Sequence, residues 1–155
     1  MAGKHRGSER GSGLVELALT MPVLIILLLG AAEFARIDYA SIEVTNAAKA
    51  GAQYGGLSSS NASNGPGIQA AVSNDASNLT GVTATSSTAG ICSSGAACTG
   101  SGGKCLSTDC STAGDHIEEV LTVTTQVTYN PTIHIPGFAT TYTLSGRATQ
   151  KVLPQ

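Results

Sequence analysis

The chain has little of what catalysis and nucleic-acid binding require. It contains no tryptophan, 4% aromatic residues and 12% charged residues, and its formal net charge is -2. A nucleic-acid partner normally needs a basic face, so this balance argues against that class. Gly-x-Ser-x-Gly, Gly-x4-Gly-Lys-Ser/Thr and His-Glu-x-x-His are absent; these motifs serve acyl transfer, phosphate binding and zinc-dependent hydrolysis. We therefore expect no enzyme, no catalytic residues and no small-molecule substrate.

One cluster of titratable residues precedes a hydrophobic stretch in the distal part of the chain. It consists of Asp115, His116, Glu118 and Glu119. Such a group could in principle bind a cation or transfer protons. The favoured interpretation is a solvated start of a strand, because charged side chains are rarely buried without partners. We expect no metal and no cofactor here.

The N-terminal part contains one long hydrophobic run. From Leu17 to Ala32 there are 16 residues without a charge, and counting back to Leu14 gives 19 with one acid, Glu16. A helix needs about 20 residues to cross the hydrocarbon core of a bilayer. The sequence therefore predicts a transmembrane helix over residues 12–36, with Glu16 at or just inside the membrane boundary and the lipid bilayer as a partner.

Charges on the two sides of this run predict its orientation. Lys4, Arg6 and Arg10 precede it, whereas Glu33 and Asp38 follow it, although Arg36 follows it too. Basic residues stay on the cytoplasmic side of a membrane span. We expect an N-terminus in the bacterial cytoplasm, a single pass through the inner membrane, and an extracytoplasmic α+β domain over residues 37–155.

Three interpretations of the hydrophobic segment remain open. It is a secretory signal peptide cleaved after the run, an uncleaved signal anchor, or a helix kept after a basic leader, residues 1–11, is removed on the cytoplasmic side. Poor cleavage sites after the run disfavour the first. Cleavage between Gly11 and Ser12 would make Glu16 the fifth residue of the mature chain, where its carboxylate could pair with the N-terminal ammonium of a neighbouring subunit. The alternative for Glu16 is a carboxylate that reaches the lipid headgroups.

Several features of residues 10–55 occur together at a characteristic spacing. They are a basic stretch, a glycine, a Val-Glu-Leu-Ala block, an early proline and a closing Glu-Phe-Ala-Arg, here at Gly11, Val15-Glu16-Leu17-Ala18, Pro22 and Glu33-Phe34-Ala35-Arg36. This pattern resembles the TadE-like proteins, pilin-like minor subunits encoded with tight-adherence (Flp, type IV) pilus machinery. In that family an alanine-rich helix follows, here near residues 46–55.

The resemblance implies a minor pilin or pseudopilin that is processed by a prepilin peptidase. It also implies other pilin-like subunits and the pilus assembly machinery as partners, and a role in assembling adhesive pili. The alternative is a single-pass, membrane-anchored binding domain that never enters a pilus. Cleavage after Gly11 distinguishes the two hypotheses, because only the first requires it.

Periodicity predicts how the helix continues beyond the membrane. Small and apolar residues recur at helical spacing over residues 37–54, at Ile37, Ala40, Val44, Ala47, Ala48, Gly51 and Tyr54. This stripe predicts the core face of an amphipathic helix, or a seam between subunits. A loop is expected over 55–66, a short helix over 67–79 and a short strand over 82–86. The Gly-, Ser- and Thr-rich residues 88–114 are expected to be irregular.

All four cysteines lie in that irregular stretch, at Cys92, Cys98, Cys105 and Cys110. Outside the cytoplasm the expected chemistry is two disulfides, whose connectivity the spacing does not determine. Zinc is the alternative, and the absence of a C-x2-C pair disfavours it.

Alternating patterns predict two strands in the last third of the chain, over 121–129 and 142–152. Apolar or small residues occupy most of the alternate positions, at Leu121, Val123, Val127 and Tyr129 and at Tyr142, Leu144, Gly146, Ala148 and Val152, as expected for half-buried strands. Pro136-Gly137 lies between them as a turn signal. We expect a small antiparallel sheet packed on the long helix, with a disulfide-tied loop.

Overall fold

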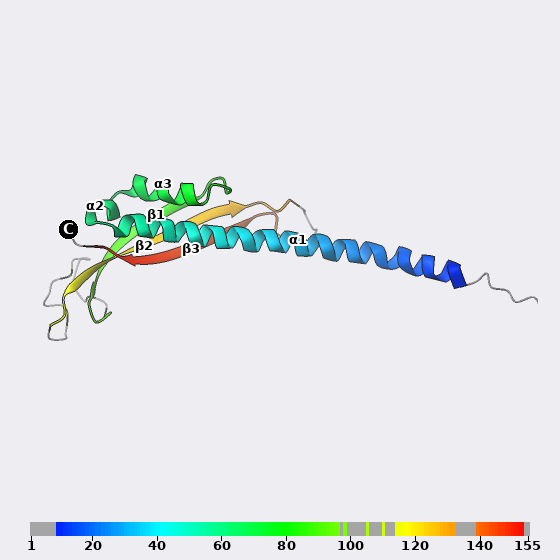
Figure 1. The fold of residues 1–155 in the computed structure, drawn as a ribbon, viewed down its shortest axis with the longest axis horizontal. Helices are drawn as coiled ribbons and strands as arrows, with labels where there is room; N and C mark the ends of the chain where they lie inside the picture. The colour runs from blue at the N-terminus through cyan, green and yellow to red at the C-terminus, as the bar shows by residue number, and fades with distance from the viewer. Residues whose placement is uncertain are drawn as a thin grey trace, which may run out of the picture.

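The computed structural model describes residues 9–96, 98, 105, 110, 114–132 and 139–153. Its elements follow in the order α1 (Glu9–Gly56), α2 (Ser59–Ala62), α3 (Gly65–Asp75), β1 (Thr83–Cys92), β2 (Ile117–Tyr129) and β3 (Tyr142–Lys151). Figure 1 shows that one half of α1 lies along the sheet and the other half projects away from it. The predicted α+β class is confirmed. Residues 1–8 of the predicted leader lie outside the described residues.

A single helix joins the hydrophobic run to the domain. α1 has 48 residues, which corresponds to about 72 Å at the usual rise per residue. Pro22 lies inside it without ending it. A proline lacks only one backbone N–H donor, so the rest of the helical hydrogen bonding is retained. The predicted continuation of the hydrophobic helix into an amphipathic one is therefore confirmed.

The predicted stripe of small residues is the buried face of α1. Ala40, Val44, Ala47 and Ala48 are at most 2% exposed. They form the core together with Ile68 and Val72 of α3 and with Leu121 and Val123 of β2. The alternation predicted for residues 121–129 is confirmed too, because the odd-numbered positions face this core. The stripe thus packs against the protein's own sheet.

The three strands form one antiparallel sheet in the order β1-β2-β3. α1 contacts β2 and β3, and α3 contacts β1, so both helices cover the same face of the sheet. β1 is longer than predicted: it runs to Cys92, so residues 88–92 are not irregular. These Gly-, Ala- and Thr-containing positions have weak strand propensity, but ten consecutive residues of β1 pair with β2. Pairing with β2 therefore stabilises β1 where its own strand propensity is weak.

Helix boundaries differ from the predicted ones near residue 60. The predicted loop over 55–66 contains the end of α1 and the short helix α2, whose first turn is capped by the Ser58 side chain accepting from the Asn61 N–H. α3 begins two residues early, at Gly65, where the Asn64 side chain accepts from the Gly67 N–H at 3.0 Å. Local side-chain caps therefore set these ends. α3 also ends four residues early, at Asp75.

α1 approaches the sheet at backbone distance. A Cβ at Gly146 of β3 would lie 2.6 Å from the Val44 carbonyl oxygen, so only glycine fits there. The buried hydroxyl of Thr125 donates a 2.8 Å hydrogen bond to the same carbonyl. The Val44 carbonyl oxygen already accepts a hydrogen bond within the helix, and its second lone pair accepts the one from Thr125. The helix is thus fixed to the centre of the sheet by packing and by a buried hydrogen bond.

Candidate functional site

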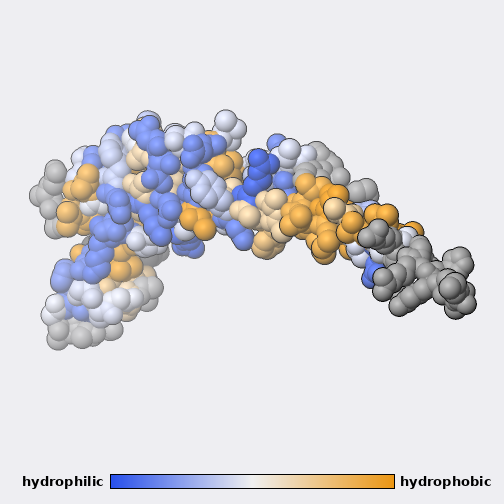
Figure 2. Space-filling view, turned by 45° about the vertical axis from the view of Figure 1, so that its right-hand side comes forward, coloured by the Kyte–Doolittle hydropathy of each residue, from blue (hydrophilic) through white to orange (hydrophobic). Residues whose placement is uncertain are grey.

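The first half of α1 is covered by no other described part of the chain. Every large apolar residue from Leu14 to Leu29 is 46% to 71% exposed. The helix is long and apolar enough to cross a membrane, and none of its most apolar 18-residue window is buried. Figure 2 shows this region as a continuous hydrophobic surface that ends where the hydrophilic surface of the domain begins. A surface of this kind is consistent with membrane anchoring.

The residues predicted for processing and assembly lie at the start of this exposed half. Gly11 and Ser12 are within the first turn of α1, and a Cβ at Gly11 would meet nothing within 4 Å. Glu16 is exposed one turn further on. Within the described residues its carboxylate has no hydrogen-bonding partner; only its backbone carbonyl is used, by the Thr20 hydroxyl at 3.0 Å. Cleavage after Gly11 and pairing of Glu16 stay predictions.

A buried carboxylate connects the exposed half of α1 to the domain. Glu33 is 7% exposed, and its Oε1 accepts a 2.9 Å hydrogen bond from the Thr132 backbone N–H. The Tyr129 hydroxyl donates to the same oxygen at 3.5 Å. Arg36, one turn along the helix, donates to the Thr132 hydroxyl at 3.0 Å and lies 4.0 Å from Glu33 Oε2. We call these four residues the neck clamp.

The sequence indicated only two of the four residues of the neck clamp. Glu33 and Arg36 belong to the Glu-Phe-Ala-Arg motif, and their spacing places them on one helix face. Nothing in the sequence marks Thr132 as their partner, because it follows β2 by three residues and lies 99 residues from Glu33. Thr132 reaches Glu33 only because the chain after β2 returns to α1.

The neck clamp also changes the acidity of its tyrosine. Burial and then the neighbouring Glu33 carboxylate raise the pKa of the Tyr129 hydroxyl, and Arg36 opposes part of this shift. Removing a proton would place a second negative charge beside Glu33 in a poorly solvated place. The hydroxyl therefore stays a neutral hydrogen-bond donor to a higher pH than an ordinary tyrosine does.

The four cysteines form two disulfides, Cys92–Cys110 and Cys98–Cys105. The bridges are nested along the chain, and this is one of the three connectivities that the spacing allowed. Cys92 is buried at the end of β1, so the outer bridge is attached to the sheet. The sulfurs of Cys92, Cys98 and Cys110 lie within 4.8 Å of one another. Sulfur in a disulfide is not a thiolate, and zinc binds the thiolate.

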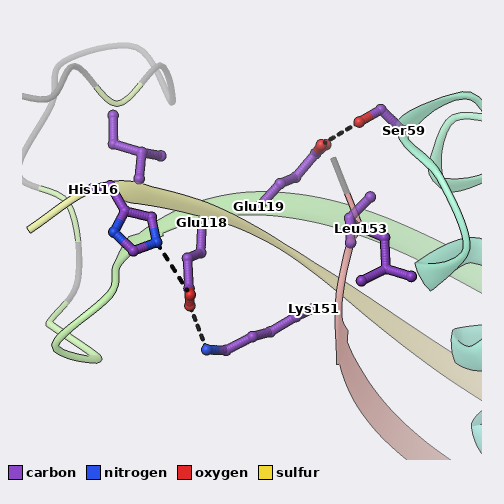
Figure 3. Close-up of a pocket in the computed structure, with 8 residues that line it drawn as sticks. Ser59, His116, Glu118, Glu119, Lys151 and Leu153 are labelled. Atoms are coloured by element: carbon purple, nitrogen blue, oxygen red, sulfur yellow. Dashed lines mark hydrogen bonds and ion pairs between the residues drawn. The ribbon is translucent and has the colours of Figure 1, made fainter. Parts of the chain in front are cut away.

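The acidic residues at the start of β2 all interact with other groups of the protein. Figure 3 shows the Glu118 carboxylate between His116 and Lys151, at 3.6 Å and 2.5 Å, and Glu119 directed toward the Ser59 hydroxyl at 3.2 Å. Asp115 accepts hydrogen bonds from Ser93 and Ser94. His116, Glu118, Glu119, Lys151 and Ser59 line a depression of about 320 Å³, and Asp115 lies outside it. Its acids are engaged with the protein itself, which favours a structural role over proton transfer.

The face of the sheet opposite α1 is lined by hydroxyl groups. The register places alternate residues of the three strands side by side on this face. These residues are Thr83, Thr85, Ser87, Thr122, Thr124, Gln126, Thr128, Thr143, Ser145, Arg147 and Thr149. No described helix covers them. Arg147 is the single charged residue of this set, and the same face continues toward the start of β2 with the ion-paired Glu118 and Lys151. This hydroxyl face is defined only by the register, since the sequence does not reveal which serines and threonines gather.

Comparison with known proteins identifies the N-terminal part of the chain. Residues 11–53 match the family described as TadE-like protein. The matched segment runs from the predicted processing site through the neck clamp motif to the buried stripe of α1. No curated protein and no solved structure gives a significant match.

Proposed function

Since residues 11–53 form a TadE-like domain, we propose that this chain is a minor pilin or pseudopilin that takes part in assembling tight-adherence (Flp-type) pili. That family is pilin-like, related to tight-adherence pili and generally non-enzymatic. In this role residues 12–36 hold the chain in the inner membrane, with the N-terminus in the cytoplasm. Residues 37–155 form the extracytoplasmic domain, attached through the neck clamp.

The exposed apolar half of α1 is the observation that carries the proposal. A helix of this length with no protein cover is stable only if lipid or other subunits surround it. Because the same helix continues into the core of the domain, any force on one half is transmitted to the other through a continuous hydrogen-bonded backbone. A subunit that must move from membrane to filament requires such a connection.

The predicted processing site supports the same role. Gly11 is exposed and followed by a polar residue, so a prepilin peptidase meets no steric obstacle there. Cleavage would leave Ser12 with a free ammonium group, four residues before Glu16. An ammonium–carboxylate pair between neighbouring subunits neutralises two charges that are costly to hold in hydrocarbon.

The N-terminal sequence and intact mass of the protein from native membranes test this proposal. We expect a mature chain that begins at Ser12. Gly11→Ala should block its formation, whereas Gly13→Ala should not; both glycines have free space around them, so neither substitution disturbs the fold. A chain that keeps residues 1–11 would contradict the pilin role, and one that begins beyond Ala32 would remove the membrane anchor as well.

The hydroxyl face favours a second candidate function. An uncovered sheet face that is polar and almost uncharged offers many hydrogen-bonding groups to a ligand or surface. A membrane-anchored binding domain that never enters a pilus would use it in this way. In that case the leader is retained, and Glu16→Gln leaves the protein's distribution between membrane and pilus fractions unchanged.

A further inference from the structure

The sheet has β1 at one edge and β3 at the other, and on β1 a side chain takes the place of a fourth strand. In an antiparallel ladder, successive residues of an edge strand point their backbone N–H and C=O alternately toward the neighbouring strand and away from it. The Gln69 amide of α3 donates to the Val82 carbonyl oxygen at 2.9 Å, and its oxygen accepts from the Ala84 N–H at 2.7 Å. The even-numbered residues of β1 therefore point away from β2.

The next part of the β1 edge is open. Its outward backbone groups belong to Ser86, Thr88 and Gly90, because the register with β2 continues without a bulge. The Cys105 sulfur lies 3.3 Å from the Gly90 carbonyl oxygen, at the far end. Among the described residues, the backbone groups of Ser86 and Thr88 have no hydrogen-bonding partner, and both residues are exposed. We call the stretch from Ser86 to Thr88 the open edge of β1.

The open edge lacks the features that usually protect an edge strand. Natural sheets block their edges with charged side chains, prolines or bulges, because free backbone groups pair with other extended chains. β1 reads Thr-Ala-Thr-Ser-Ser-Thr-Ala-Gly-Ile-Cys and contains no charge and no proline. Its small side chains leave room for a neighbouring backbone. A row of alternating donors and acceptors is complementary to another extended backbone, so the partner that fits is a β-strand.

β3 offers a second edge on the same chain. The Leu153 N–H, two residues after β3, donates to the Gly56 carbonyl of α1, whereas the preceding Val152 N–H donates to β2. The odd-numbered residues of β3 therefore point away from β2. Among the described residues, the outward backbone groups of Arg147 and Thr149 have no hydrogen-bonding partner, and both residues are exposed.

The two edges run in the same direction. β1 and β3 are both antiparallel to β2, so they are parallel to each other. β2 and β3 lie alongside α1 (Figure 1). Copies held in one membrane by α1 share the direction of that helix. Antiparallel pairing of β1 with β1 would point the two membrane helices in opposite directions, whereas pairing of β1 with β3 of the next copy keeps them parallel.

We propose that the open edge of β1 pairs in parallel with the β3 edge of a second copy of this chain. The proposal rests on the common membrane orientation given under the proposed function. Such a contact is heterologous, because each copy uses one edge for one neighbour and keeps the other edge for the next. It therefore builds rows or rings of copies rather than a symmetric dimer. It also joins the domains outside the membrane without using Glu16.

Proline variants block one edge at a time. Thr88→Pro removes an outward N–H of β1, and Thr149→Pro removes an outward N–H of β3; neither N–H points toward β2, so the internal ladder is kept. Full chains are extracted from native-host membranes in mild detergent, and their oligomers are counted by native mass spectrometry. We expect dimers and larger species for the unaltered chain. Each variant alone should associate at least about tenfold more weakly, because a main-chain hydrogen bond is lost.

Combining the two variants in one membrane tests whether the pairing is head to tail. A Thr88→Pro copy keeps its β3 edge and a Thr149→Pro copy keeps its β1 edge, so together they should form dimers with one copy of each and nothing larger. Association of Thr149→Pro equal to that of the unaltered chain would overturn the proposal, because β1 would then pair with itself or with another protein. A combination that stays monomeric, although both variants keep the near-UV circular dichroism of the folded domain, would overturn it too.

A photoreactive residue tests the contact in a chain with both edges intact. Benzoylphenylalanine replaces Ser87, whose side chain lies on the hydroxyl face beside the open edge, or Gln53 on the exposed side of α1 as the control. Irradiation of native membranes should link position 87, but not position 53, to β3 of another copy. Links from position 87 to a different protein, or no link between copies, would overturn the proposal whatever the proline variants do.

The same membranes report on the pilin role separately. A chain that keeps residues 1–11 but links β1 to β3 between copies would refute the pilin role and leave the edge pairing intact. A chain that begins at Ser12 and gives no such link would do the opposite.

Discussion

The two halves of α1 use apolar residues of different size. From Leu14 to Leu29 the exposed half is built of leucine, isoleucine, valine and methionine, whereas the buried half, from Ala40 to Ala52, is built mainly of alanine and glycine. Hydropathy alone would place the larger residues inside. The difference follows from what each half touches when the exposed half spans the membrane as proposed. Lipid chains adapt to any bulky side chain, but a pleated sheet can lie against a helix backbone only where small residues leave room.

The neck clamp marks the point where one environment replaces the other. Glu33 is buried although it follows directly on the uncovered run, and Phe34, its neighbour, is 66% exposed. The domain therefore begins to contact α1 at Glu33, on one side of the helix only. The following predictions test whether the two halves of α1 are as different as their composition indicates.

A charge in the exposed half should have the largest effect. Leu27→Lys places an ammonium near the centre of the span, which costs about 3 kcal/mol on insertion scales. Gln53→Lys adds the same charge to the exposed side of the buried half and should change nothing. The fraction of chain that resists alkaline extraction from membranes measures the effect. Equal extraction of both variants would show that the exposed half is not in lipid.

A substitution that adds side-chain volume should have the larger effect in the buried half of α1 and little effect in the exposed half. A Cβ at Gly51 would lie 2.7 Å from Val72 Cγ2, whereas one at Gly30 meets nothing within 4 Å. We expect Gly51→Leu to lower the free energy of unfolding of the domain by about 2–3 kcal/mol through overpacking. Gly30→Leu should leave it unchanged. Denaturant unfolding followed by near-UV circular dichroism of the tyrosines distinguishes the variants, and a matching loss in both would contradict the comparison.

Loss of the neck clamp should weaken the attachment of the residues after β2 to α1. Glu33→Ala leaves the Thr132 N–H without its acceptor, which costs about 1–2 kcal/mol, and should speed hydrogen exchange at the Thr132 amide. Glu33→Gln keeps an acceptor oxygen and should preserve most of the protection. If both variants exchange as slowly as the unaltered chain, the clamp is not what holds the connection after β2.

Alkaline pH should weaken the same attachment by a smaller amount, through ionisation of Tyr129. Burial and Glu33 raise the pKa of Tyr129 above its value in the unfolded chain, about 10. The proton is thus bound more tightly in the folded state, so the stabilisation is complete below pH of about 10 and is lost as pH rises through the folded pKa. Tyrosinate absorbance should show one late-titrating group that Tyr129→Phe removes. Glu33→Gln should lower the pKa of Tyr129.

The sequence was sufficient wherever one strong local pattern acted. Helical spacing of Ala40, Val44 and Ala47 predicted the buried face of α1, and strict alternation predicted β2 and its neighbour β3. Prediction failed where distant residues decide the structure. The second half of β1 has weak strand propensity and is held by its pairing with β2. The same reason hid the partner of Glu33 and the hydroxyl face.

The candidate site was predictable in its residues but not in its arrangement. Composition indicated two disulfides, and only the fold selects Cys92–Cys110 with Cys98–Cys105. The motif of Glu33 and Arg36 was evident, but Tyr129 and Thr132 meet them only through the return of the chain at the end of β2. Contacts of this kind depend on topology, which no local pattern encodes.

The nested bridges give the domain a particular covalent topology. The inner disulfide closes a ring over residues 98–105, and the outer disulfide closes a larger ring from Cys92 to Cys110 that contains the inner one. Cys92 is fixed at the end of β1. A protease that cuts once inside either ring opens a loop without releasing a fragment, because both new ends stay tethered to the sheet. In the proposed extracytoplasmic location, a single proteolytic cut between the cysteines would therefore leave the chain as one molecule.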